Sequence, residues 1–92
     1  MSYNESYFFC KHIAWQEEQS TNIIYVFDLK NNCSFLIDGV GRDIWLLINN
    51  HLSIDEMIII LSRNYAKSTN KITRDLELFI LQMTEENLIF KM

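Results

Sequence analysis

Hydrophobic residues change their spacing near residue 38, and this change divides the chain into two kinds of predicted element. Before residue 38, apolar and aromatic residues form short runs bounded by turn residues, which is typical of β-strands. After it, apolar residues recur every three or four positions, which is typical of amphipathic helices. The pattern therefore predicts an α+β fold, with a three-stranded antiparallel sheet followed by three helices.

The strands are predicted in the first forty residues. Asn22–Asp28 has a β-branched and aromatic centre, and Cys33–Ile37 follows the turn residues Lys30–Asn32. These two strands should form a hairpin. The aromatic-rich run Tyr7–Ile13 predicts the remaining strand, and we expect the polar stretch Gln16–Thr21 to connect it to the hairpin.

Helix boundaries are predicted from capping residues. We expect Asp38 to cap the first helix, and Ser53 with Glu56 three residues later to form a capping box at the second. Thr69 or Asn70 should cap the third helix, and Asn87 is a plausible left-handed residue after its end. The residues expected to face the core from the first two helices are Val40, Ile44, Leu47, Ile48, Ile54, Ile58, Leu61 and Tyr65.

The third helix has apolar residues on two faces. Its core stripe, at about 100° per residue, consists of Ile72, Leu76, Phe79, Ile80 and Met83. Leu78 and Leu81 point the other way, alongside Arg74. We expect this second stripe to be covered by another layer of the fold, by a second copy in a homodimer, or by a different partner.

Composition narrows the classes of function. With 92 residues, 49% hydrophobic content and no proline, the chain is expected to form one domain over residues 1–92. A net charge of −4 with eight scattered basic residues argues against binding to nucleic acid or to an anionic membrane. There is no signal-peptide pattern and no apolar run of the roughly 20 residues that a membrane span needs, so we expect a cytoplasmic protein.

Catalytic and metal-binding patterns are hard to find in this sequence. His12 and His51 lack the helical spacing of metal ligands, and two cysteines cannot complete a structural zinc site, so no metal or cofactor is expected. Cys10 with His12 could form a nucleophile, but no third group is evident to orient them. A small enzyme that uses Cys10 or Cys33 is therefore a weak alternative, and the chain reads as a binding module.

Residues Tyr25 to Ile89 resemble the PqqD family, whose fold is also called the precursor-peptide recognition element. The resemblance covers the hairpin, the segment Asp38–Trp45 with its small residues and Ile-Trp pair, and the hydrophobic pattern of the two later helices. At Asn87 the family commonly has glycine, and asparagine can adopt the same left-handed conformation.

The resemblance implies a function in pathways that modify ribosomally made peptides. Members bind the leader of a precursor peptide as an added strand on the third strand, against the third helix, and deliver it to a radical SAM protein, a protease or a cyclase. In this sequence the implied strand residues are Cys33, Ser34, Phe35, Leu36 and Ile37. The implied helix residues are Arg74, Leu78 and Leu81.

A winged helix-turn-helix regulator that binds DNA has similar size and elements, and it is the alternative function. It would need a basic outer face on its recognition helix. The third helix instead offers Lys71 and Arg74 against Glu77, Glu85 and Glu86. This balance of charge favours the peptide-binding function.

Overall fold

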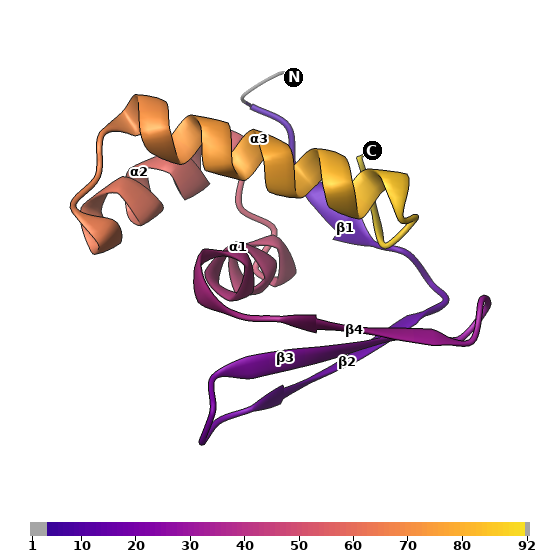
Figure 1. Cartoon of the computed structure of the whole chain (residues 1–92). Helices are drawn as coiled ribbons and strands as arrows, with labels where there is room; N and C mark the ends of the chain where they lie inside the picture. Colours follow the sequence, from indigo (N-terminus) through magenta and orange to yellow (C-terminus); the bar gives the residue numbers. More distant parts are fainter. Residues whose placement is uncertain (1–3, 92) are drawn as a thin grey trace.

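A computed structural model describes residues 4–91, and its helices all lie on one side of a twisted sheet (Figure 1). Three strands form this sheet in the order β2-β3-β4, and two shorter strands pair separately as β1-β5. The elements in chain order are β1 (Tyr7–Phe9), β2 (Ile13–Glu18), β3 (Ile23–Asp28), β4 (Cys33–Ile37), α1 (Gly39–Asn49), α2 (Ile54–Tyr65), α3 (Thr69–Glu85) and β5 (Ile89–Lys91). The predicted α+β fold, with a three-stranded antiparallel sheet before three helices, is confirmed.

The first strand of the sheet was predicted at the wrong place. Of the predicted strand Tyr7–Ile13, only Ile13 joins the hairpin, as the first residue of β2; β1 pairs with β5 instead. The stretch expected to be a connection instead supplies half of β2, which pairs with β3 from Ile13↔Asp28 to Glu18↔Ile23. In this half of β2, a polar side chain takes the place of an apolar one because Glu17 forms an ion pair with Arg42 of α1. The usual alternation of apolar and polar residues is therefore absent from this part of the strand.

The β3–β4 hairpin forms as predicted, in the register Ile24↔Ile37 to Asp28↔Cys33. Adjacent side chains on a strand point to opposite faces, so Ile24 and Val26 face the helices and are fully buried. Tyr25 and Phe27 alternate with them and lie on the other face. The sheet therefore has an inner face packed on helices and an outer face turned away from them.

Capping explains where α2 and α3 start. The capping box at Ser53 and Glu56 is confirmed, with both reciprocal hydrogen bonds present. The cap of α3 is Ser68, which accepts a hydrogen bond from the backbone N–H of Lys71, so the expected cap at Thr69 or Asn70 was wrong by one or two residues. Asp38 occupies the N-cap position of α1, but its side chain makes no capping hydrogen bond.

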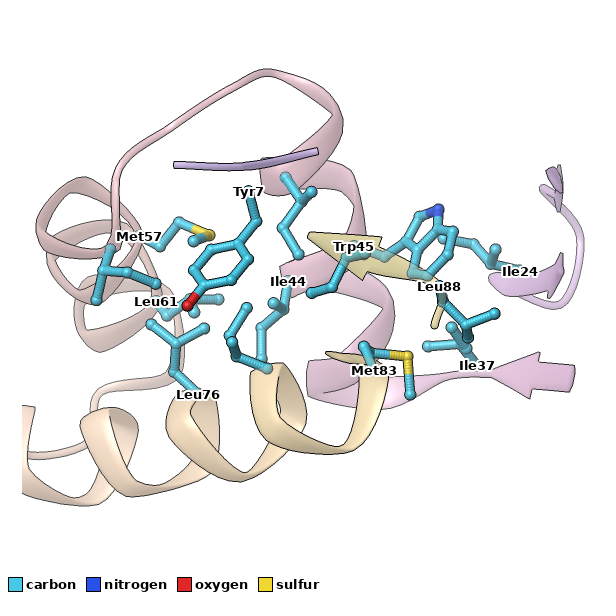
Figure 2. Packing of buried hydrophobic residues seen from close by; sticks show 14 of the residues in the cluster. Tyr7, Ile24, Ile37, Ile44, Trp45, Met57, Leu61, Leu76, Met83 and Leu88 are labelled. Carbon is cyan, nitrogen blue, oxygen red and sulfur yellow. The ribbon is translucent and has the colours of Figure 1, made fainter. Parts of the chain in front are cut away.

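The core lies between α1, the inner face of the sheet and the other two helices (Figure 2). Most residues predicted to face it do so. Val40, Leu47, Ile58, Tyr65 and Phe79 pack at its margin and are only partly buried. Trp45 and Met57 are fully buried although they lay outside the expected stripes. Trp45 stacks on Phe9 with ring centroids 4.4 Å apart, which places β1 against α1.

The short β1-β5 pair closes the molecule. Asn87, with φ of 60°, adopts the left-handed conformation predicted for it, and the chain then reverses from α3 into β5. Leu88 and Ile89 are buried at this reversal. In the part of the chain from residue 4 to residue 91, no helix has the length and hydropathy needed to cross a membrane.

Candidate peptide-binding edge

Strand β4 is an edge of the sheet, since within residues 4–91 it pairs only with β3. An edge strand presents unpaired backbone N–H and C=O groups, and proteins usually protect such edges with charge or proline. The opposite edge, β2, ends in Gln16, Glu17 and Glu18, whereas β4 reads Cys-Ser-Phe-Leu-Ile without a charge or a proline. β4 is therefore the edge better suited to accept another strand.

The side chains of β4 divide between the two faces of the sheet. Phe35 and Ile37 lie on the inner face, opposite Val26 and Ile24, and are half-buried and buried respectively. Ser34 and Leu36 lie on the outer face, where Leu36 is 67% exposed. A strand added to β4 would consequently contact apolar side chains on either face.

The turn before β4 is held by Asp28, which is 2% exposed. Its carboxylate accepts hydrogen bonds from the backbone N–H groups of Lys30 and Asn31 and from the Asn31 side chain. The bonds from Asn31 are the main reason that the pKa of Asp28 is lowered, and the nearby His12 at 3.8 Å lowers it further. The start of β4 at Cys33, opposite Asp28, is thereby fixed.

Helix α3 approaches β4 through Phe79. A methyl group at Gly41 would lie 3.0 Å from a ring carbon of Phe79 and 3.2 Å from a methyl carbon of Ile37. Only glycine gives this clearance at the first turn of α1 without displacing a neighbour. The contact shows which flank of α3 faces the β4 side of the molecule.

This orientation places the three α3 residues implied for leader binding at different distances from the β4 side; together they are called the α3 wall below. All three are exposed, Leu78 at 60% and Leu81 at 55%. Among these three, Leu78 lies nearest to Phe79 around the helix axis, on the side away from the core. Arg74 and Leu81 lie roughly 40° and 60° further round than Leu78. Asp75 and Gln82 lie between Phe79 and Leu78 by the same spacing. The sequence pattern did not indicate Asp75 and Gln82 as residues near β4, because it cannot show which flank of α3 turns toward this strand.

A network of charged side chains sets how the sheet meets the helices. Arg42 of α1 bonds to Glu17 of β2 and, at 3.0 Å, to Asp43. Tyr65 of α2 donates a hydrogen bond to Asp43, which raises the pKa of Tyr65 to about 12. Arg42, Asp43 and Tyr65 line a surface hollow together with Asn22 and Gly39. Nothing in the local sequence indicated this network, because its members come from three separate elements.

The weak alternative of a catalytic cysteine gains no support from the surroundings of Cys10. Cys10 and Cys33 are both free thiols. Burial, and to a lesser degree the charge of Asp28, raises the pKa of Cys10, which disfavours the thiolate that a nucleophilic cysteine needs. Among residues 4–91, no group of three or more His, Cys, Asp and Glu side chains is arranged to hold a metal ion.

Comparisons with known proteins identify relatives of this fold. A solved structure described as "TbiB1 in Complex with the TbiA(beta) Leader Peptide" matches with a TM-score of 0.83 and 18% sequence identity, covering 88% of this chain and 92% of that chain. No curated protein matches. The family model "Coenzyme PQQ synthesis protein D (PqqD)" matches residues 24–89, well over half of the chain. The chain therefore belongs to the PqqD family.

Proposed function

We propose that this protein binds the leader segment of a ribosomally synthesised precursor peptide and presents it to a modifying enzyme, such as a radical SAM protein, a leader peptidase or a cyclase. The observation that carries the proposal is the open, uncharged edge of β4 below the Phe79 flank of α3. The family membership, and the fold shared with a protein that was solved with a leader peptide, support it.

The mode of binding is strand addition. Backbone groups of Cys33–Ile37 would pair with the leader, and alternate leader side chains would enter a groove that the bound strand itself would complete between Phe35, Ile37 and α3. Backbone pairing supplies affinity for many sequences, while the groove selects apolar side chains at every second position. No catalytic step is assigned to this chain, whose role is that of an adaptor.

The α3 wall would select among leaders. Of the three predicted residues, Leu78 lies nearest to the Phe79 flank, beyond Asp75 and Gln82, and its exposed side chain would contact an apolar leader residue. Arg74 could pair with an acidic residue further along the peptide. Leu81, which points further from β4, would contribute less unless the peptide or the enzyme wraps around α3.

A titration with synthetic leader peptides encoded beside the gene of this chain tests the proposal. We expect binding at concentrations on the order of tens of micromolar or below. A leader methylated on alternate backbone nitrogens should lose affinity in one register and keep it in the other, since strand addition uses every second N–H. No binding by any neighbouring leader, or equal loss in both registers, would contradict strand addition.

Substitutions on α3 test the wall. Leu78→Asp should weaken leader binding by about tenfold or more, because burying an exposed leucine is worth roughly 1.5–3 kcal/mol. Leu81→Asp should weaken it less. Ile59→Asp is the matched control, since Ile59 is 57% exposed on α2, away from the groove. Equal effects from all three substitutions would show that α3 does not form the wall.

A further inference from the structure

The end of the β3–β4 hairpin carries a surface hollow beside the start of the open edge. Its volume is about 220 Å³, several times the roughly 30 Å³ that one molecule occupies in liquid water, so it has room for a side chain. Both strands and the turn between them contribute to its lining, which consists of Phe27, Asp28, Leu29, Asn32, Cys33 and Ser34. A strand that pairs with β4 would pass directly beside this hollow, because Cys33 and Ser34 belong to the edge strand itself.

Ser34 is a small side chain among larger apolar ones. The ladder places it directly opposite Phe27, and Leu36 follows it on the same outer face of the sheet, opposite Tyr25. Phe27 is 41% exposed and Leu36 is 67% exposed, and the helices lie on the other side of the sheet (Figure 1). Little side-chain bulk therefore separates the Phe27 ring from the free edge of β4.

An added strand must place side chains on both faces of the sheet, because successive residues of a strand alternate between them. A leader strand on β4 would lie two strand spacings, or about 10 Å, from β3. A large leader side chain opposite Ser34 would extend over part of this distance, and the Phe27 ring extends over the rest. Strand addition thus brings one leader side chain over Ser34 and against Phe27.

We propose that Ser34 and Phe27 form a second specificity site for the leader, which takes a large apolar or aromatic side chain on the outer face of the sheet. The inference rests on the proposed function, because it needs a strand on β4. The leader residue two positions away would cover Leu36 in the same way. Since intervening residues would enter the groove beneath α3, the recognised segment of the leader would be a run of consecutive apolar residues.

The charges around the hollow favour an uncharged occupant. Among the described residues that line it, only Asp28 is charged, and this side chain is 2% exposed. Its carboxylate already accepts three hydrogen bonds, from Lys30 and Asn31 of the turn. A charged leader side chain would therefore lose water without gaining a partner, whereas an aromatic one would pair with the Phe27 ring.

Exchanging the sizes of the facing side chains tests the inference. The probe is the synthetic leader that binds most tightly, together with variants in which each leader residue is replaced in turn by alanine. With the parent protein, the replacement opposite Ser34 should weaken binding about tenfold. Ser34→Leu fills the gap, so the parent leader should bind this variant more weakly. The leader with alanine at that position should bind Ser34→Leu at least as tightly as it binds the parent protein.

A second variant, Phe27→Thr, removes the ring but keeps a β-branched residue in the strand, and it should reduce the cost of the same alanine replacement. Ala14→Leu is the matched control. Ala14 is also exposed and lies directly opposite Phe27, but on β2, so the substitution adds similar bulk beside the same ring at the other edge. It should leave the alanine scan of the leader unchanged. Circular dichroism of each variant establishes that it is folded.

The outcomes separate this inference from leader binding itself. The same alanine scan for the parent protein, Ser34→Leu and Phe27→Thr would overturn the inference and leave leader binding intact. A changed scan with Ala14→Leu but not with Ser34→Leu would place the leader on β2 and would also overturn it. If the parent protein binds no leader, the proposed function fails and this inference fails with it.

Discussion

Glu18 ends β2 by accepting hydrogen bonds from Ser20 and Thr21, which close the turn into β3. The side-chain hydrogen bond from Ser20, followed by that from Thr21, lowers the pKa of Glu18 from 4.5 to about 2. Folding therefore favours the ionised carboxylate. A few such side chains, with Asp28 at the next turn, determine where the strands begin and end.

These lowered pKa values predict acid sensitivity. A carboxylate whose pKa is depressed by folding stabilises the protein fully above its unfolded pKa, and this stabilisation is lost as the pH falls through the folded value. For Glu18 the loss should occur between pH 4.5 and about 2. Glu18→Gln should therefore lose less stability than the parent between these limits, as measured by urea unfolding. Identical pH dependence of the two proteins would show that the turn does not hold Glu18 ionised in solution.

At the scale of elements, the close approach of α3 to the start of α1 depends on Gly41. A valine there would force Phe79 or Ile37 to move, and overpacking of this kind costs about 1–3 kcal/mol. Gly41→Ala should change the free energy of unfolding much less. Its shorter side chain displaces the neighbours by only a few tenths of an ångström, and alanine gains about 1 kcal/mol over glycine in helix propensity. Equal stability of the valine and alanine variants would contradict the close packing.

The sequence predicts elements well where one periodicity continues over several residues. The stripe of α3 and the exposure of Leu78 and Leu81 follow from helical spacing and are confirmed. The position of β2 was missed because Gln16–Glu18 is polar, and its ion pair with Arg42 is a tertiary contact. The flank of α3 that faces β4 also depends on a tertiary contact, that of Phe79 with Gly41. The role of β4 and α3 in binding stays a prediction.

At the scale of the whole molecule, the β1-β5 pair joins segments that are more than eighty positions apart, since Tyr7 pairs with Lys91. No local pattern predicts such pairing, because each strand has only three residues. The pair is nevertheless part of the core: Tyr7 and Ile89 are buried, and Phe9 stacks on Trp45. The sheet, the helices and the β1-β5 pair, called the clasp below, therefore all contribute to the stability of the fold.

Tyr7→Ala tests the importance of that clasp. Removing a buried aromatic side chain typically costs about 3–5 kcal/mol, a large share of the total for a domain of this size. Phe90→Ala is the control, because Phe90 lies in the partner strand but is 41% exposed, and its loss should be smaller. Chemical denaturation of both variants gives the comparison. A cost for Tyr7→Ala no greater than that for Phe90→Ala would show that β1 does not contribute to the core.

The antiparallel register of the clasp also sets its mechanical behaviour. Tyr7, at the start of β1, lies beside Lys91, at the end of β5, so a force applied to the two ends would open the pair one hydrogen bond at a time, like a zipper. When two strands are pulled apart from one end, their hydrogen bonds break one after another. When they are pulled in opposite directions along their length, all the hydrogen bonds bear the force together. Under tension the clasp should therefore part first, while the β2-β3-β4 sheet and the open edge of β4 stay folded.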